Sequence, residues 1–360
     1  MVWTLFDYYG EPPVGGYEVS SSYGQYDLCG FPKAAAFWYR TQWLLAIADG
    51  QPDKTFLTNG KAEVHLVESW ESPDAFPSTR GNTSRAIHAY SSAPSVELYV
   101  PCSSLFNPLG VCASSPHPLV TRTRGRYVNG VSQGVKKVTR MVHAPGSYAE
   151  WLAVPWTAGN LTAVARDVAG KAVATDARFT NGAAAALTLS IDAPSAVTGT
   201  GSALLLDGSD AALLRASVVD AAGRVMHLAT HNVSFRVVSG PGAVQGTHNG
   251  DTHSHLPNNS PWYPAYHGLV RAVIRVTSSA GRDVAERALL RQIDVSGPMA
   301  ATLSPEEAKL AMDTSPILVE ASTPGLPPVR VSIPTSTDPA DGVLAVAQAA
   351  AGKPVDFFGH

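Results

Sequence analysis

Histidines and a carboxylate gather in one stretch of the sequence, and these residue types in that pattern could bind a metal ion. The residues are His248, His253, His255 and His267, with Asp251 among them. A neutral imidazole is a good ligand for zinc or another divalent ion, and a carboxylate beside a His-x-His pair would extend such a ligand set. The Asp, Asn, Gly and Ser residues around them are turn formers, which favours a long hydrogen-bonded loop instead. We therefore predict no metal and no other cofactor.

Two more patterns have the spacing of catalytic residues without the context that catalysis needs. Residues 130–134, Gly-Val-Ser-Gln-Gly, fit a nucleophile elbow, which requires a strong strand before the serine and a helix after it. Neither flank has that character, so a solvated loop is favoured over a serine hydrolase. Glu68 and Glu71 lie in a strand-rich segment and would point to different faces, which makes them a poor acid and base pair.

The clearest pattern lies near the start of the sequence. Residues 3–8, Trp-Thr-Leu-Phe-Asp-Tyr, are followed by Gly and Pro, which predicts a buried strand and then a turn. Pro32 after Gly30 predicts the first position of a helix. The apolar stripe of that helix would contain Phe37, Trp38, Thr41, Leu44 and Leu45. About twenty residues rich in Gly, Pro, Ser and Tyr separate strand from helix, and a loop that long is usually functional or disordered. Its aromatic residues favour function.

Three segments of this region resemble the last strand, loop and helix of the catalytic barrel in glycoside hydrolase family 2, the β-galactosidase-like enzymes. They are residues 3–12, Trp-Thr-Leu-Phe-Asp-Tyr-Tyr-Gly-Glu-Pro, residues 21–24, Ser-Ser-Tyr-Gly, and residues 27–33, Asp-Leu-Cys-Gly-Phe-Pro-Lys. The resemblance implies that residues 1–47 are the last βα unit of a (β/α)8 barrel. One position departs from the family pattern, since Leu5 stands where the family commonly has Gly.

The resemblance implies a sugar-binding role for residues at the end of this strand. In the family, the Trp at the position of Trp3 lines the subsite at which the sugar is cleaved, and an indole face stacks on the apolar C–H face of a pyranose. Sites in such barrels lie at the C-terminal ends of the strands, where Asp7, Tyr8 and Glu11 would fall. These four residues are the expected substrate-binding residues.

The resemblance also implies chemistry that these residues do not supply. Retaining glycosidases use a general acid and a nucleophilic carboxylate roughly 5 Å apart. In this family both glutamates come from barrel strands four and seven, upstream of the strand that contains Trp3. Only Met1 and Val2 precede it here. We therefore expect no catalytic residue in this chain, and no activity from it alone. The full-length form would hydrolyse O-glycosyl bonds of β-galactoside-like glycans with retention. The alternative is a non-catalytic β-sandwich module that binds carbohydrate or protein.

The remaining sequence predicts a mainly β fold with two sandwiches. Residues 48–61 form an expected linker, residues 62–182 a β-sandwich with a basic insertion at 107–148, and residues 184–295 an immunoglobulin-like sandwich. The tail, residues 296–360, is expected to be mostly disordered, with a short helix near 305–312 that begins with a capping box.

Strand-like runs support this division. They are residues 62–67, 95–100, 187–191, 213–219, 233–238 and 269–276, with turns at 167–171 and 220–223. Residues 95–99 resemble the strand that follows the barrel in family 2, and residues 151–164 resemble its later strand pair. Residues 239–269 resemble the C-terminal domain of the family in the order and spacing of their motifs.

The composition of the chain limits the classes of partner that it could bind. The chain has 360 residues, of which 45% are hydrophobic and 15% are charged, and these numbers fit roughly two to three globular domains. A formal net charge of -3 gives no basic surface for nucleic acid or an anionic membrane. No apolar run approaches the roughly 20 residues of a membrane span. We expect carbohydrate as the partner of the full-length form, no nucleic acid and no membrane, and leave the oligomeric state open.

The cysteines and the glycosylation motifs are informative about the cellular compartment of the chain. Cys29 is expected to be a small buried residue, whereas Cys102 and Cys112 could close a disulfide loop in an oxidising compartment. Four sequons would be glycosylated if the chain enters the secretory path, and they favour an extracytoplasmic location. Their asparagines are Asn82, Asn160, Asn232 and Asn258.

Overall fold

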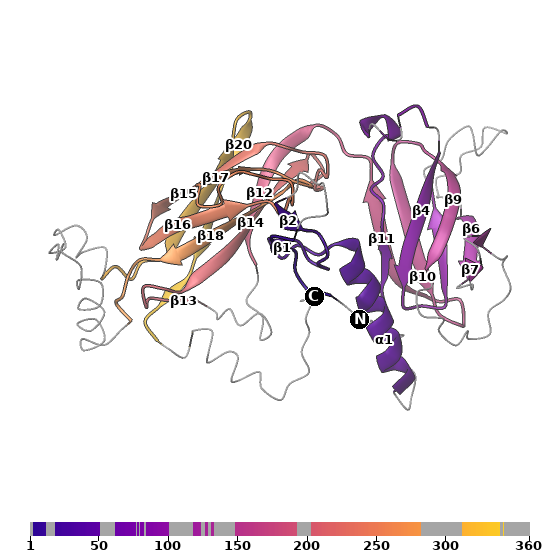
Figure 1. The fold of residues 1–360 in the computed structure, drawn as a ribbon, viewed down its shortest axis with the longest axis horizontal. Helices are drawn as coiled ribbons and strands as arrows, with labels where there is room; N and C mark the ends of the chain where they lie inside the picture. Colours follow the sequence, from indigo (N-terminus) through magenta and orange to yellow (C-terminus); the bar gives the residue numbers. More distant parts are fainter. Residues whose placement is uncertain are drawn as a thin grey trace. The chain divides into compact units, whose positions relative to one another are not determined.

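The computed structural model describes residues 3–11, 19–50, 62–76, 78, 80–82, 84–100, 118–123, 127–128, 131–132, 148–192, 203–281, 312–338 and 341. The chain divides into two compact units (Figure 1). The first unit comprises residues 1–8 and 22–181, and the second comprises residues 9–21 and 182–360.

The first unit is a sandwich of two antiparallel sheets. One sheet has the strand order β11-β10-β5-β6 and the other has the order β3-β4-β9. The strands are β3 (Val64–Leu66), β4 (Ser84–Ser91), β5 (Ser95–Tyr99), β6 (Pro118–Thr123), β9 (Ala149–Pro155), β10 (Asn160–Arg166) and β11 (Ala172–Phe179). Short elements are the 3-10 turn η2 (Pro73–Ala75) and the strands β7 (Tyr127–Val128) and β8 (Val131–Ser132).

Alternating side chains build the core of this sandwich. In β10, Leu161, Ala163 and Ala165 are fully buried while the residues between them are partly exposed, because successive side chains of a strand point to opposite faces. Trp70 is also fully buried and donates its indole N–H to the carbonyl oxygen of Thr157 at 2.9 Å. The turn expected at 167–171 joins β10 to β11 as predicted. The strand pair expected at 151–164 is present, although β9 and β10 belong to opposite sheets.

The helix α1 (Ala34–Gly50) precedes this sandwich in the chain. It begins two residues after Pro32. Of the expected stripe, Thr41 and Leu45 are buried, whereas Phe37, Trp38 and Leu44 are partly exposed. The ring of Phe37 stacks on the imidazole of His65, with 3.6 Å between the ring centroids. The linker expected from residue 48 was placed too early, because the helix continues through Gly50.

The strand expected at residues 3–8 is wrong. Regular pairing begins only at β1 (Tyr8–Tyr9), which forms a two-stranded sheet with β2 (Ser20–Ser21). Instead, the carbonyl oxygen of Leu5 accepts hydrogen bonds from the backbone N–H groups of Gln25 and Tyr26. Phe6 also forms an isolated parallel bridge with Tyr26. The last βα unit of a barrel, expected at residues 1–47, stays a prediction.

The second unit is also a sandwich of two antiparallel sheets, with the strand orders β12-β14-β18-β16 and β17-β15-β19-β20. A short parallel pair, β13-β21, accompanies them. The strands are β12 (Ala184–Ile191), β13 (Leu204–Leu205), β14 (Ala211–Asp220), β15 (Asn232–Ser239), β16 (Gly242–His248), β17 (Trp262–Pro264), β18 (Leu269–Val276), β19 (Ile317–Thr323), β20 (Leu326–Ile333) and β21 (Thr335–Ser336). The mainly β fold with two sandwiches is therefore as the sequence predicts.

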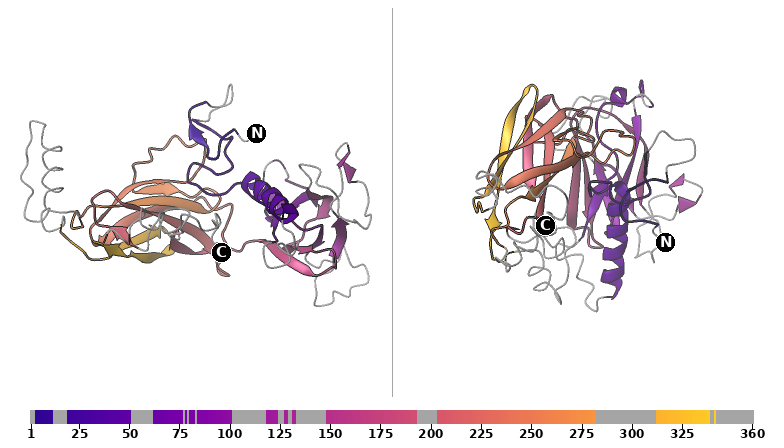
Figure 2. Two further views of the ribbon diagram at one scale, coloured as in Figure 1. Left: turned by 90° about the horizontal axis from the view of Figure 1, so that it is seen from below. Right: turned by 60° about the vertical axis from the view of Figure 1, so that its left-hand side comes forward.

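The disordered tail expected from residue 296 is wrong for residues 317–336. The yellow strands β19 and β20 lie within the second sandwich (Figure 2), and Ile317, Val319 and Ile333 are buried in its core. The two prolines of β20, Pro327 and Pro328, are tolerated because β20 is the edge strand of its sheet.

Several expectations fall on residues outside the described part of the chain. They concern most of the basic insertion at 107–148, the flanks of the elbow at 130–134, the helix near 305–312, and the pair Cys102 and Cys112. No helix among the described residues is long and apolar enough to cross a membrane.

Candidate functional site

Trp3 presents its indole to solvent on the loop that precedes α1. The residue is 70% exposed, and its Nε1 donates a hydrogen bond of 3.1 Å to the hydroxyl of Tyr8. The hydroxyl of Thr4 donates to the carbonyl oxygen of Phe6 at 2.8 Å and so closes a turn between them. The exposed indole is therefore held at its polar edge while its faces stay open.

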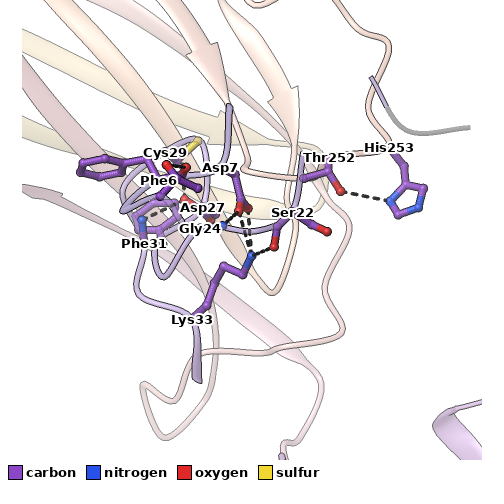
Figure 3. A network of polar contacts seen from close by, with 11 residues as sticks. Phe6, Asp7, Ser22, Gly24, Asp27, Cys29, Phe31, Lys33, Thr252 and His253 are labelled. Atoms are coloured by element: carbon purple, nitrogen blue, oxygen red, sulfur yellow. Dashed lines mark hydrogen bonds and ion pairs between the residues drawn. The ribbon is translucent and has the colours of Figure 1, made fainter. Parts of the chain in front are cut away.

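Asp7 belongs to this loop, is buried, and bonds to residues at its far end (Figure 3). Its Oδ1 accepts from the backbone N–H of Gly24 at 2.7 Å and from Nζ of Lys33 at 2.9 Å, and its Oδ2 lies 3.1 Å from the same Nζ. Lys33 also donates to the carbonyl oxygen of Ser22 at 2.8 Å. Because the Asp7 side chain is only 2% exposed, its geometry suits positioning of the loop better than direct contact with a substrate.

Asp27 organises the turn that leads into the helix. Its Oδ1 accepts from the backbone N–H groups of Cys29 and Phe31 at 2.8 and 2.9 Å, in the manner of an Asx turn. Gly30 adopts the left-handed φ of 78° that this turn requires. Cys29 is buried, as expected.

Glu11 belongs to the second unit and has an uncommon backbone conformation. Its φ is 48°, a value that non-glycine residues rarely adopt, and its side chain is exposed. The same segment holds Tyr9, whose hydroxyl lies 3.3 Å from Nε2 of His248 and 3.3 Å from Nδ2 of Asn258. The backbone N–H of Val19 donates to the carbonyl oxygen of Thr252 at 3.1 Å. The segment is thus tied to the loop between β16 and β17.

The histidines of that loop take part in its hydrogen bonds. Nδ1 of His253 lies 3.4 Å from Oδ1 of Asp251, which also accepts from the His253 backbone N–H at 3.0 Å. Burial lowers the pKa values of His248 and His267 below their usual range. Among the residues that the structure describes, no group of three His, Cys, Asp or Glu side chains could hold a metal ion. The loop is hydrogen-bonded, as its turn formers indicate.

One cluster of titratable groups is not predicted by the sequence. His88 on β4 lies between two carboxylates, with its Nδ1 2.5 Å from Oε1 of Glu68 and its Nε2 3.0 Å from Oε1 of Glu150. The hydrogen bond that His88 donates to Glu68, and after it the one to Glu150, raises the pKa of His88. These residues are far apart in the sequence and meet only in the folded chain, so no local sequence pattern predicts the cluster. Glu68 therefore pairs with His88, rather than forming a catalytic pair with Glu71.

The chain is similar to known proteins in parts of its sequence. Residues 196–284 match a family model described as glycoside hydrolase family 2 C-terminal domain 5, and residues 82–174 match one described as a domain of unknown function, DUF4982. The chain is also similar to beta-galactosidase BoGH2A of Bacteroides ovatus, with 28% identity over 282 residues. That alignment covers 78% of this chain and 26% of the relative.

These matches make the chain similar to the C-terminal portion of glycoside hydrolase family 2. Solved structures agree with this similarity at the level of the fold. A beta-glycosidase from Bacteroides vulgatus superposes with a TM-score of 0.58 at 19% identity, over 92% of this chain and 30% of that one. A glycosyl hydrolase family 2 member from Bacteroides cellulosilyticus gives 0.57 at 18% identity, over 92% and 33%. The chain thus spans about a quarter to a third of the length of these relatives.

The four sequon asparagines are all exposed. They are Asn82, Asn160, Asn232 and Asn258. Nδ2 of Asn258, the atom that a glycan would modify, is the donor to the hydroxyl of Tyr9. Glycosylation in an extracytoplasmic compartment stays a prediction from the sequons.

Proposed function

We propose that this chain is the C-terminal part of a retaining β-glycosidase and that Trp3 forms one wall of the subsite at which the sugar is cleaved. The observation that carries this is the exposed Trp3 indole, 70% accessible and fixed at Nε1 by the hydroxyl of Tyr8. An indole in that state offers a flat apolar face with little freedom left to lose when a pyranose stacks on it. A β-galactoside-like glycan is the proposed substrate of the full-length form, in line with the name of the Bacteroides ovatus relative.

The neighbouring residues have supporting roles in this proposal. Tyr8 orients the indole, and the ion pair between Asp7 and Lys33 holds the loop that presents it. Glu11, exposed and in a left-handed conformation, is proposed to contact the sugar hydroxyls. Leu5 and Phe6, each 49% exposed, are proposed to pack against the rest of a catalytic barrel.

The two catalytic glutamates are proposed to come from residues that this chain does not contain. Retention requires a nucleophilic carboxylate and a general acid roughly 5 Å apart across the scissile bond. Glu68 and Glu150, the two carboxylates that meet in the first sandwich, are both bonded to His88. We therefore expect the chain alone to leave glycosides intact.

A comparison of two proteins tests this proposal. The 360-residue chain and any longer product of the same reading frame are incubated with p-nitrophenyl β-galactoside, and the release of nitrophenol is followed. We expect release only from the longer protein. Turnover by the 360-residue chain at the rate of the longer protein would overturn the proposal that the catalytic glutamates lie outside this chain.

The role of Trp3 is tested in the longer protein. Trp3→Ala should lower kcat/KM roughly 5- to 10-fold, because it removes a stacking face worth about 1 to 1.4 kcal/mol in the transition state. Tyr8→Phe, which removes only the hydrogen bond to Nε1, should have a smaller effect in the same direction. Trp43→Ala is the matched control, since Trp43 is 53% exposed on α1. Unchanged kinetics for Trp3→Ala would exclude the assigned role.

A further inference from the structure

The outward face of the sheet β17-β15-β19-β20 carries an ordered grid of polar and aromatic side chains. In one row, Trp262 on β17 pairs with Ser234 on β15, which pairs with Ser322 on β19. In the adjacent row, Arg236 on β15 pairs with Glu320 on β19, which pairs with Arg330 on β20. The alternate residues of β15, Val233 and Phe235, are buried in the core. The two rows therefore share the face that points away from it.

The second row is an ion-pair chain across three strands. Arg236 donates from Nε and Nη2 to Oε1 of Glu320, both at 2.7 Å, and Arg330 donates from Nε to Oε2 at 2.7 Å. The Glu320 side chain is 7% exposed, whereas those of Arg236 and Arg330 are 60% and 54% exposed. Both carboxylate oxygens are occupied, and hydrogen bonds from Arg330 and Arg236 keep the pKa of Glu320 low. Two cations around one anion leave a net positive charge on the face.

Both guanidinium groups keep donors that Glu320 does not use. No described residue is hydrogen-bonded to Nη1 of Arg236 or to either Nη atom of Arg330. The two Nη atoms of one guanidinium present parallel N–H groups at the spacing of a carboxylate, which allows a bidentate contact. The row is therefore complementary to a carboxylate anion.

The first row supplies an aromatic surface and hydroxyls beside these donors. Trp262 is 39% exposed, and its backbone is fixed because its carbonyl oxygen accepts from Thr247 at 3.0 Å. Trp262 and Arg236 are diagonal neighbours on the face, a relationship that places Cβ atoms about 7 Å apart and within reach of long side chains. Ser234 lies between Trp262 and Ser322 in the same row. Ring stacking, hydroxyl contacts and carboxylate binding thus meet on one surface.

We propose that this face binds a polysaccharide that contains uronic acid. One sugar ring stacks on the indole of Trp262, its hydroxyls bond to Ser234 and Ser322, and a ring carboxylate is held by the outer N–H groups of Arg236 and Arg330. A carboxylated polysaccharide satisfies the aromatic surface and the positive charge together, whereas an acidic peptide satisfies only the charge. The inference does not rest on the proposed glycosidase function, because Trp3 belongs to the other unit.

Affinity electrophoresis of the whole 360-residue chain tests the proposal with three immobile polymers. Polygalacturonate carries sugar rings and carboxylates, galactan carries sugar rings without charge, and poly-L-glutamate carries carboxylates without sugar rings. We expect retardation by polygalacturonate well above that by either of the others. Retardation by poly-L-glutamate to the same extent would reduce the site to a charge effect and overturn the proposal, as would no retardation by polygalacturonate.

Variants separate the two rows. Trp262→Ala should raise the Kd for polygalacturonate roughly 3- to 10-fold, the range expected for one stacked ring, and leave the weak binding of poly-L-glutamate unchanged. Arg330→Gln should weaken the binding of both polymers. The matched controls are Arg275→Gln, at an exposed arginine of β18 on the opposite sheet, and Trp43→Ala, and both should bind as the parent does.

Two further measurements test whether the face itself holds the polymer. Ser234→Glu adds a negative charge at an exposed position without removing a member of the ion-pair chain, so it should abolish polygalacturonate binding while the melting temperature stays unchanged. Sedimentation velocity of the parent and of Trp262→Ala should show the same species. If Trp262→Ala dissociates an oligomer instead, the face is a contact between copies of the chain, and the polysaccharide proposal is wrong.

Discussion

The backbone N–H of Gly250 donates a hydrogen bond of 3.0 Å to Nδ1 of His248. An Nδ1 atom that accepts carries no proton, so the neutral ring holds its hydrogen on Nε2. Nε2 lies 3.3 Å from the hydroxyl of Tyr9 and therefore donates to it. The ring is also in contact with Tyr263, with 4.9 Å between the centroids. One tautomer of His248 thus connects the loop after β16 with the segment that contains Tyr9.

We predict that acidification weakens this connection. Burial lowers the pKa of His248 in the folded chain below its usual value of about 6.5. The folded state therefore binds fewer protons than the unfolded state. The stabilisation is complete above pH about 6.5 and is lost as the pH falls from there through the folded pKa. Protonation of Nδ1 would also remove the acceptor for the Gly250 N–H.

Proton NMR of the imidazole resonances, with hydrogen exchange of the β16 amides from pH 7.5 to 5, measures this effect. We expect a His248 midpoint below 6.5 and faster exchange at the lower pH. His248→Gln keeps a polar side chain but does not titrate, and should make the exchange less dependent on pH. A His248 midpoint at or above 6.5 would contradict the prediction.

The first sandwich should respond to pH with the opposite sign at His88. The hydrogen bonds that Glu68 and Glu150 accept from His88 raise its pKa, so the folded state holds this proton more tightly than the unfolded state. Their contribution is complete below pH about 6.5 and is lost as the pH rises through the folded pKa. Hydrogen bonds to a charged group contribute about 1.5 kcal/mol each at partly exposed sites. His88→Gln should therefore destabilise the fold by about 1 to 2 kcal/mol at pH 6 and by less at pH 9.

Urea unfolding followed by tryptophan fluorescence reports on this unit, because Trp262 is the only one of the seven tryptophans outside it. His65 has a lowered pKa of about 3, from burial and then from the charge of Arg178, and contributes with the sign of His248. The difference between parent and His88→Gln across the pH range isolates His88 from His65. An equal difference at pH 6 and pH 9 would show that His88 does not titrate between its two carboxylates.

The parts of the fold that the sequence predicts are those whose signal is local. Leu161, Ala163 and Ala165 alternate with partly exposed residues, and that period alone indicates a strand with one buried face. The C-terminal hairpin was missed because Pro327 and Pro328 indicate a loop, although an edge strand tolerates proline. Position in the sheet, which local sequence does not contain, decides between the two.

For a related reason, the sequence predicts some features of the candidate site and misses others. The exposed Trp3 and its contact with Tyr8 lie within one short segment, so the family motif locates both. The burial of Asp7 depends on Lys33, which is distant in sequence, and the motif alone assigned it to the substrate instead. His88 and Glu150 come together only through the register of β4 and β9. Contacts that form only when distant segments of the chain pair cannot be predicted from the sequence of one segment.

The ion pair between Asp7 and Lys33 should stabilise the loop of residues 3–8, which contains Trp3. Asp7→Asn leaves Lys33 without its buried counter-charge and should destabilise the first unit by about 3 kcal/mol. Lys33→Met should destabilise it as well, and the double variant should lose less than the sum of the two, with a coupling of about 1 to 3 kcal/mol. Urea midpoints of the four proteins give that cycle, with the exposed Lys171→Met as control. Additive losses would show that the two side chains act independently.

Gly24 should be irreplaceable even by alanine, because the loop backbone surrounds it. A Cβ at this position would lie within 3.0 Å of backbone atoms of Phe6, Asp7 and Tyr26, and no side-chain rotation relieves such a contact. Gly24→Ala should therefore displace the loop, cost about 3 kcal/mol or more, and expose residues 3–8 to limited proteolysis. Gly182→Ala is the matched control, since its nearest neighbour is the Asp220 Cβ at 3.9 Å. Equal protease resistance of the two variants would mean that the loop adjusts without displacing Trp3, and the anchoring described for Asp7 and Gly24 would then be wrong.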